Sequence, residues 1–576
     1  MRLKLFLITL VAGMLLSASL LAADSVVVSQ DDNRITLANG LVEVTWNKSN
    51  ADLISIKKNG VSLLGAKGRG YLLGPGFSMW PATFSIVKQT PDMVELSFYH
   101  VGSNHFQYDL HYVLRSGISG PYCFLIQSHK KEDPLGDYGQ TRWGLSADEN
   151  LFDYHLVGDN HQGPMPKMAS LTNQVQDWTF RFPDSTYYTK YDYAEYIEGR
   201  HVHGMAGQKS GYGIFIIQSS HEYLQGGPTK QYQTVHATPY LICMFNDGHF
   251  LSDKRPDDSK ITGDWVKLSG PFLLYINSGK DVNTVWADAK KQCLEEISKW
   301  PYKWMNNSEY PLERGLIKGV LKFADGKPAA NAHVIIGAPG MDWQAQQRGY
   351  MWYTTANANG SFIIKNVRPG NYSLYSYCTN ITDDLTMNNV SVTVDKETDL
   401  GDILWATKNY RKLWQIGIAD RFTDGFKLSD HKRYYDVFTK VPAHLDYIVG
   451  KSKPDEDWYY AQTKPGSWNI IFDVKEEYKG EGVLTIGIAG ATKNAQYDVL
   501  LNGAKLGKYY FGNDASIYRS AIKGGYYQKL EVKFAADLLK TGSNKITFEM
   551  PNVKPGGGVM YDVVKLEIND KPLDAQ

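Results

Sequence analysis

The sequence of 576 residues has few cysteines and no excess of charge of either sign. Its four cysteines are too few and too widely spaced for a disulfide-rich scaffold or a zinc site, and their spacing does not determine whether any two pair. Lysine plus arginine and aspartate plus glutamate both number 61, so net charge does not favour nucleic acid or an acidic polymer as a partner. We therefore expect no nucleic-acid partner. The cysteines are Cys123, Cys243, Cys293 and Cys378.

Long hydrophobic runs are scarce as well. The one near the N-terminus follows Arg2 and Lys4 and ends in small residues near Ala23, which is the pattern of an export signal. It is short for a transmembrane helix, and no other segment approaches about 18 uninterrupted apolar residues. We predict a signal peptide over residues 1–23 and a secreted or periplasmic monomer with no membrane partner.

Several catalytic motifs are missing too. The sequence has no glycine-rich phosphate loop opening a helix, no His-Glu-x-x-His zinc motif and no Gly-x-Ser-x-Gly nucleophile elbow. Aromatic residues, by contrast, are abundant, with 38 tyrosines and 14 tryptophans. They suit the packing of β-strands, which we favour, or the stacking of sugar rings.

Alternating apolar and polar residues run through most of the chain, as in residues 42–46 and 106–114. Asn59-Gly60 is a typical two-residue hairpin turn. Helical spacing is nearly confined to residues 281–300. The sequence therefore predicts a mostly β protein.

Composition divides the chain into three parts. Residues 300–311 follow the predicted helix, carry two prolines and lack a clean period, so a first boundary is expected there. The next segment, with turns at Asn359-Gly360 and Pro369-Gly370, resembles a small β-sandwich. At least six regular strands then predict a jelly-roll-like domain. We predict domains over residues 24–308, 309–406 and 407–576.

Six segments carry a resemblance to a known family: "TKYDYA" at 189–194, "HVHG" at 201–204, "GGPTKQ" at 226–231, "FNDGH" at 245–249, "GSFIIKNVRPGNYSLY" at 360–375 and "LWQIGIADR" at 413–421. Together they resemble the polysaccharide lyase family 4 rhamnogalacturonan lyases, over essentially the whole mature chain. The resemblance implies a galactose-mutarotase-like β-sandwich, a fibronectin-III-like β-sandwich and a carbohydrate-binding-module-like jelly roll.

The same resemblance implies cleavage of rhamnogalacturonan I by β-elimination, which leaves an unsaturated galacturonate at the new non-reducing end. This reaction needs a base for the C5 proton, a cation for the uronate charge and help for the leaving oxygen. By resemblance, Lys190 is the base and His249 is its partner.

A lysine with an ordinary pKa is almost fully protonated at neutral pH, a handicap of about 4 to 5 kcal/mol. Burial among the neighbouring tyrosines, or a nearby arginine, would lower the pKa of Lys190, whereas Asp192 or Glu195 would raise it. If residues 190–192 are extended, Asp192 points to the same side as Lys190. The sequence leaves the sign of the shift open.

For substrate binding we predict Arg142, Tyr188, Tyr191 and His203. A guanidinium suits a uronate because it donates two parallel hydrogen bonds, and Arg115 and Arg200 are rivals of Arg142 for this role. His203 shares one strand face with His201. No cofactor or catalytic metal is predicted, although oxygen ligands in "NDGHF" and "TGDW" could hold calcium as a structural ion.

Two other classes of protein stay open. A non-catalytic pectin-binding protein with the lyase frame is one, because Ile242 and Met244 stand where fungal members carry tyrosines. A glycoside hydrolase is the other, but the motifs supply no pair of facing carboxylates. Residues 458–460, Trp-Tyr-Tyr, suit either a sugar platform or a domain core.

Overall fold

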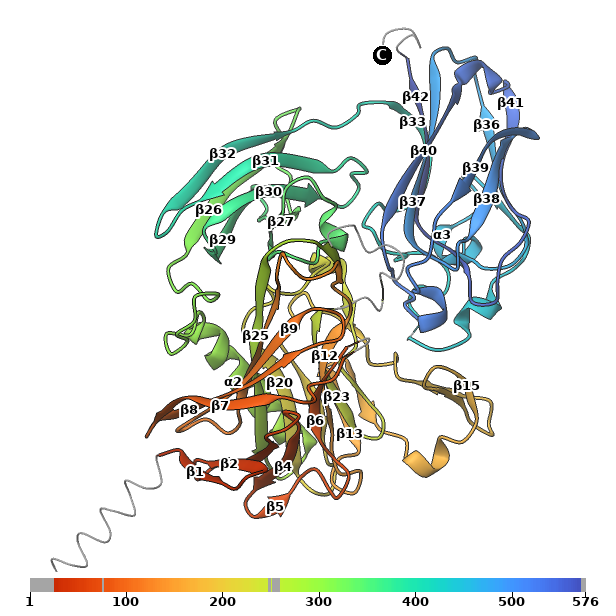
Figure 1. The fold of residues 1–576 in the computed structure, drawn as a ribbon. Helices are drawn as coiled ribbons and strands as arrows, with labels where there is room; N and C mark the ends of the chain where they lie inside the picture. The colour runs from red at the N-terminus through yellow and green to blue at the C-terminus, as the bar shows by residue number, and fades with distance from the viewer. Residues whose placement is uncertain (1–24, 75–76, 247–249, 251–258, 432, 571–576) are drawn as a thin grey trace, which may run out of the picture.

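A computed structural model describes residues 25–74, 77–246, 250, 259–431 and 433–570, which form three β-sandwiches in chain order (Figure 1). The mostly β prediction is confirmed. The predicted signal peptide, residues 1–23, lies outside the described residues. Among those that are described, no helix has the length and apolar character needed to cross a membrane.

The N-terminal sandwich consists of β1 to β25 and the helix α2, and its core lies between two large antiparallel sheets (Figure 1). The first sheet has the order β1(Val27–Gln30), β2(Arg34–Ala38), β3(Glu43–Asn47), β4(Leu53–Lys58), β6(Gly70–Leu73), β12(Thr141–Ser146), β23(Tyr240–Asn246) and β22(Val235–His236), with β5(Val61–Ser62) on β4. The second has the order β14(His161–Pro164), β13(Tyr154–Gly158), β19(Val202–Ala206), β20(Tyr212–Gln218), β25(Trp265–Ser278), β10(Tyr122–His129), β9(Gln107–Arg115), β8(Met93–Val101) and β7(Thr83–Thr90).

Smaller sheets extend from this sandwich. They are β11(Gly136–Asp137) with β24(Lys260–Ile261), β18(Glu195–Tyr196) with β21(Gln231–Tyr232), and β15(Gln174–Gln176) with β16(Thr179–Arg181) and β17(Tyr187–Thr189). The last of these, the β15–β17 sheet, carries the predicted base at its end.

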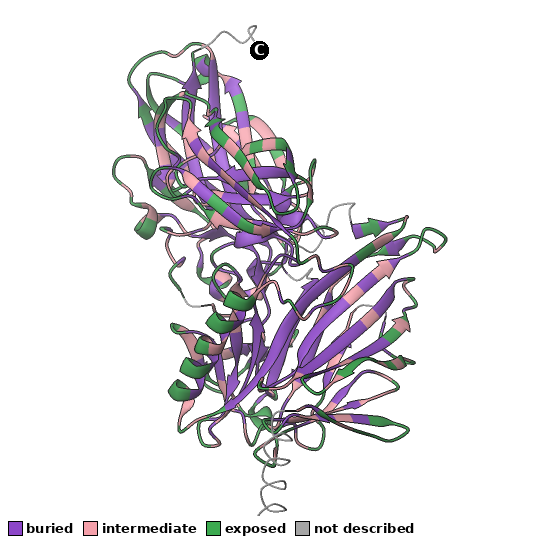
Figure 2. Cartoon of the chain, turned by 90° about the vertical axis from the view of Figure 1, so that its left-hand side faces the viewer, coloured by how far each residue is buried: buried purple, intermediate pink, exposed green. Residues whose placement is uncertain are grey.

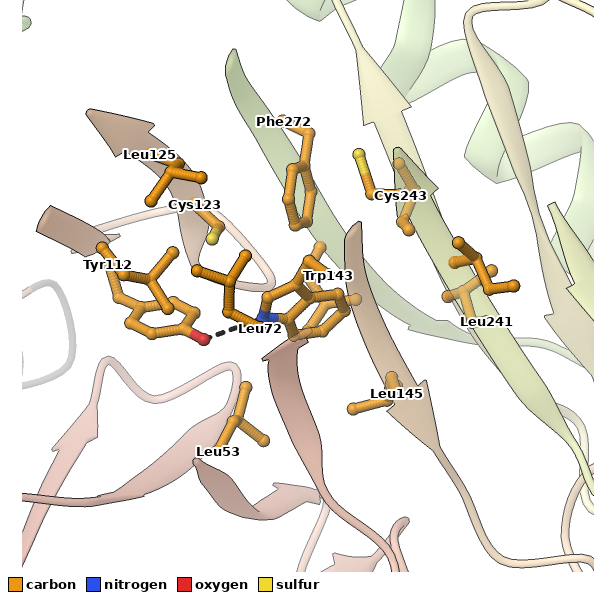
Figure 3. Packing of buried hydrophobic residues seen from close by; sticks show 14 of the residues in the cluster. Leu53, Leu72, Tyr112, Cys123, Leu125, Trp143, Leu145, Leu241, Cys243 and Phe272 are labelled. Atoms are coloured by element: carbon orange, nitrogen blue, oxygen red, sulfur yellow. Dashed lines mark hydrogen bonds between the residues drawn. The ribbon is translucent and has the colours of Figure 1, made fainter. Parts of the chain in front are cut away.

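Large side chains fill the space between the two sheets, as Figure 3 shows. Trp143 is fully buried; its Nε1 donates a hydrogen bond to the Tyr112 hydroxyl at 2.8 Å, and its ring packs against Phe272. Cys123 and Cys243 lie in the same core, and all four cysteines are unpaired and buried. Burial of this kind makes the thiols inert packing groups.

The predicted helix is confirmed as α2(Val282–Lys299). Asp281 caps its N-terminus by accepting a hydrogen bond from the Thr284 N–H at 2.7 Å. Val285, Ala289 and Cys293 are buried against the outer face of the second sheet, as their spacing predicts.

The middle sandwich pairs a three-stranded sheet with a four-stranded one. The first is β29(Ser361–Val367), β26(Gly315–Phe323) and β32(Glu397–Trp405), and the second is β28(Trp352–Thr355), β27(His333–Gly337), β30(Gly370–Tyr377) and β31(Leu385–Val392). The predicted boundary at residues 308/309 falls between α2 and β26.

The C-terminal sandwich contains the predicted jelly-roll strands. One sheet is β33(Arg411–Gly417), β42(Gly558–Asn569), β37(Glu481–Thr492) and β40(Gln528–Ala535), with β35(Ala461–Gln462) on β42. The other is β34(Leu445–Ile448), β36(Gly466–Val474), β41(Gly542–Met550), β38(Gln496–Leu501) and β39(Ala504–Tyr510), where the Asn502-Gly503 turn joins the last two.

The structure decides between the two readings of residues 458–460. Trp458 is fully buried and packs edge-on against Trp468 and Tyr561, and Tyr460 is 2% exposed. Both are core residues of the C-terminal sandwich. The interpretation of this segment as a sugar platform is therefore wrong for these two side chains.

Figure 2 shows that the strands of the sandwiches are mostly buried, and buried charged groups also join the N-terminal and middle sandwiches. Glu222 is buried and pairs with Arg314 at 2.5 Å and Arg368 at 2.8 Å. Removing one member of such a set would leave an uncompensated buried charge, so these pairs hold the two sandwiches in one arrangement.

Candidate active site

Lys190 lies at the end of the β15–β17 sheet, immediately after β17. Thr179 and Thr189 are partners in the register of β16 and β17, and their side chains are hydrogen-bonded at 2.8 Å. The Lys190 N–H then donates to the Trp178 carbonyl at 2.9 Å. This pairing brings the turn that precedes β16 alongside Lys190.

The turn supplies an acidic partner for the lysine. Lys190 Nζ lies 2.7 Å from Asp177 Oδ2, and the same oxygen accepts a hydrogen bond from the Tyr191 hydroxyl at 3.2 Å. The Lys190 side chain is 11% exposed, whereas that of Asp177 is 56% exposed. The amine is thus enclosed while its acidic partner faces solvent.

Neither carboxylate considered from the sequence occupies this place. Residues 190–193 form a turn and are not extended, so the alternation argument for Asp192 is wrong. Asp192 is turned inward, where it accepts a hydrogen bond from the Thr189 N–H at 3.0 Å, and Glu195 pairs with His161 at 2.7 Å. Burial raises the pKa of Asp192 to about 7, against opposing effects of the Thr189 bond and of Arg433.

The surroundings of Lys190 shift its pKa. Burial is the largest influence and lowers its pKa; the bond and charge of Asp177 oppose this shift, and the positive charges of Arg142 and Arg519 reinforce it. The net direction is downward. Sequence reasoning left this sign open, and a lowered pKa is what a lysine needs in order to accept a proton near neutral pH.

Arg142 is brought toward Lys190 by the first large sheet. It lies on β12, opposite Met244 of β23, and its charge acts on both Lys190 and His236. The two rival arginines have other partners, since Arg200 lies 3.9 Å from Glu195 and Arg115 stacks on Trp304. Arg142 is therefore the best placed of the three predicted arginines to meet a carboxylate beside Lys190.

A second arginine reaches the site from the C-terminal sandwich, and sequence reasoning missed it. The Arg519 guanidinium carbon lies 5.4 Å from the centre of the Tyr191 ring, on the short 3-10 helix Ile517–Arg519. Gln176 Nε2 donates to the neighbouring Tyr518 carbonyl at 3.0 Å and so ties this helix to the β15–β17 sheet. No motif around residue 519 indicated this position, because it depends on how two sandwiches pack.

The two predicted tyrosines line the inside of the site. Tyr191 is 1% exposed, with Lys190 Nζ 5.3 Å from its ring centre, so it encloses the amine. Tyr188 is 6% exposed, and its hydroxyl contacts His155 Nε2 at 3.2 Å and accepts a hydrogen bond from the Ala237 N–H. Both phenols support the site from within, where neither offers a wide face to a sugar.

The structure does not bring His203 to Lys190. His203 is 7% exposed, its Nε2 donates to the Ile242 carbonyl at 2.7 Å, and burial lowers its pKa to about 4. A different histidine, His236, adjoins the site: it packs against Trp178, and burial lowers its pKa to about 4, assisted by the charge of Lys190. Neutral His236 therefore adds no positive charge to the site near pH 7.

The predicted partner His249 lies outside the described residues, as does most of "NDGHF". Phe250, its neighbour in sequence, is described; it packs edge-on against Tyr191 and contacts Arg433. Among the residues that the structure describes, no three histidine, cysteine, aspartate or glutamate side chains are grouped to hold a metal ion. Calcium as a structural ion stays a prediction.

The site therefore combines a largely enclosed lysine with the charges of two arginines, on the first of three β-sandwiches. Three family descriptions match the chain: "Rhamnogalacturonate lyase family" over residues 15–186, "Polysaccharide lyase family 4, domain II" over 324–400 and "Polysaccharide lyase family 4, domain III" over 412–566. The chain belongs to the rhamnogalacturonate lyase family of polysaccharide lyases, as the sequence resemblance predicted.

Individual relatives match this chain over nearly its whole length. The chain is 32% identical to a protein named rhamnogalacturonate lyase from Dickeya dadantii, over 95% of both chains. It is 22% identical to a probable rhamnogalacturonate lyase B from Neosartorya fischeri, over 94% of this chain and 97% of that protein. A solved family 35 carbohydrate binding module covers 18% of this chain and 67% of the module at 16% identity, with a TM-score of 0.14.

Proposed function

We propose that this protein cleaves the rhamnose-galacturonate backbone of rhamnogalacturonan I by β-elimination and leaves an unsaturated galacturonate at the new non-reducing end. Family membership and the names of the relatives support the substrate class. The observation that carries the reaction is the enclosed Lys190 amine, whose pKa is lowered by burial and by two arginines.

Each chemical requirement has a candidate group. Lys190 takes the C5 proton, and the electron pair of that bond forms the C4=C5 double bond as the C4–O4 bond breaks. Arg142 pairs with the uronate carboxylate, which makes the C5 proton more acidic by stabilising the charge that develops there. His249, the proposed partner of Lys190, is the candidate group that helps the leaving oxygen.

The alternative is a pectin-binding protein without turnover, which rests on Ile242 and Met244. Both side chains lie in the buried strand β23 and are 1% and 3% exposed. Both are packing residues of the sandwich, and the assay below separates the two functions.

One assay tests the proposal. The protein is incubated with rhamnogalacturonan I while the ultraviolet absorbance of the conjugated product and the chain length are followed. A lyase raises the absorbance as chains shorten, a hydrolase shortens chains without that absorbance, and a binding protein does neither.

Two variants place the base. Lys190→Ala and Lys190→Arg should both abolish the absorbance signal, because arginine stays protonated at ordinary pH. Lys209→Ala, at an exposed lysine of the same sandwich, is the control and should retain activity. Turnover by either Lys190 variant would show that the base is another residue.

The remaining expectations are part of the same proposal. We propose a secreted or periplasmic monomer that needs no cofactor for catalysis, with calcium at most a structural ion. Activity after exhaustive treatment with a chelator should therefore persist at 25 °C. Its loss, and its recovery on adding calcium, would show that the reaction uses the ion.

A further inference from the structure

The reaction leaves Lys190 protonated, and the enzyme must remove that proton before the next turnover. The Lys190 side chain is only 11% exposed, so the amine has little direct contact with water. The Tyr191 ring lies over the amine. The positive charges of Arg142 and Arg519 disfavour the protonated form of Lys190. A route for the proton is therefore needed.

Asp177 has the geometry of such a route. Its Oδ2 lies 2.7 Å from Lys190 Nζ, which is hydrogen-bonding distance, while 56% of its side chain is exposed. One carboxylate thus touches the enclosed amine and the solvent together. In the part of the chain that the structure describes, the Lys190 amine donates its hydrogen bond to Asp177.

We propose that Asp177 carries the proton between Lys190 and solvent, and so restores the neutral amine after each elimination. The inference rests on the proposed function. In each cycle the C5 proton moves to the Lys190 amine, then to the Asp177 carboxylate and then to water. The leaving oxygen takes one proton from water, and the proton that Asp177 releases replaces it, so the cycle neither stores nor loses protons.

The other groups that face Lys190 are suited to a supporting role. The Tyr191 hydroxyl donates to the same Asp177 oxygen at 3.2 Å and holds it toward the amine. Arg142 and Arg519 favour the loss of the Lys190 proton, whereas the negative charge of Asp177 favours its retention. His236 is neutral at working pH, because burial lowers its pKa to about 4.

The test uses Asp177→Ala, which removes the carboxylate and opens a path for small bases from solution. With rhamnogalacturonan I at saturation, we expect kcat to fall by about 100-fold or more, since one positioned proton-transfer group typically contributes about 100- to 10,000-fold. Imidazole or acetate at rising concentration should then restore kcat severalfold in Asp177→Ala and leave the unaltered protein unchanged.

Two further variants separate the relay from a structural role. Asp177→Glu keeps a carboxylate and should recover most of the lost rate without added buffer. Asp184→Asn changes another exposed aspartate, between β16 and β17, and should match the unaltered protein. Melting temperatures within a few degrees of each other would show that all of these chains are folded.

The outcomes are distinct. If the unaltered protein forms no unsaturated product, the lyase proposal fails and the relay fails with it. If it is active but Asp177→Ala keeps its kcat, or loses kcat without any response to buffer, the relay alone is overturned.

Discussion

Arg519 and Tyr191 meet across the junction of the C-terminal and N-terminal sandwiches, with the guanidinium carbon 5.4 Å from the ring centre. The same ring lies 5.3 Å from the Lys190 amine. The C-terminal sandwich therefore contributes a positive charge to the site of the proposed base, besides any contact that it makes with the polysaccharide.

Replacing Arg519 by methionine should weaken the reaction through Lys190. Without this positive charge the pKa of Lys190 rises, and each unit of rise lowers the neutral fraction near pH 7 by about tenfold. The acid limb of the pH profile of kcat/KM should therefore move to higher pH. Arg519→Lys should restore the profile.

A matched control for this variant is Arg411→Met, since Arg411 lies in the same sandwich, is exposed and pairs with Glu476 at 2.5 Å. It should leave the profile in place. An unmoved profile in the Arg519→Met protein, with its melting temperature retained, would mean that Arg519 does not influence the base.

Replacing Arg142 by glutamine should affect the handling of the uronate. The substrate carboxylate would lose a charged hydrogen-bond partner, whose removal costs about 1.5 to 3 kcal/mol. We expect kcat/KM to fall by about 10- to 150-fold on the plateau of the pH profile, where the base is deprotonated. Arg200→Gln is the comparison, and a larger loss there than at Arg142 would assign the uronate to Arg200.

Replacing Asp192 by asparagine should stabilise the protein at alkaline pH. The pKa of Asp192 is raised to about 7 in the folded protein. The protonated carboxyl therefore stabilises the fold at low pH, and this contribution to the free energy of unfolding is lost as pH rises through 7. Asparagine carries no charge at any of these values. The variant should gain about 4 kcal/mol in the free energy of unfolding at pH 8, from a shift of about three pKa units.

Near pH 4, the difference in unfolding free energy between the two proteins should be much smaller, because Asp192 is then protonated in the folded state and about half protonated in the unfolded chain. Denaturant unfolding at pH 4, 6 and 8 measures this trend. If the difference in unfolding free energy stays constant or shrinks as pH rises, the buried Asp192 carboxyl is not the source of the pH dependence.

Replacing Trp458 by alanine should destabilise the C-terminal sandwich by about 3 to 5 kcal/mol, since a fully buried ring leaves a large cavity. Thermal unfolding measures this loss. Tyr510→Ala, at a ring that is 68% exposed, is the control and should change stability little. Equal effects of the two variants would contradict the assignment of Trp458 to the core.

The regular elements were predictable because each depends on its own neighbours along the chain. Alternation placed β9 and the six C-terminal strands, helical spacing placed α2, and Asn59-Gly60 and Asn502-Gly503 adopt positive φ angles as hairpin turns do. The burial of Trp458 was not predictable, because alternating residues do not reveal whether an aromatic ring faces a core or a ligand.

The sequence by itself determined the β architecture, the helix and the family, together with Lys190 and Arg142 as candidates, because local periodicity and motifs lie within short stretches. Only the tertiary structure decided that Asp177, and not Asp192, is the partner of Lys190, and that Arg519 joins them. The register of β16 and β17 sets the first of these contacts, and the packing of two sandwiches sets the second. Neither arrangement is written in the spacing of residues along the chain.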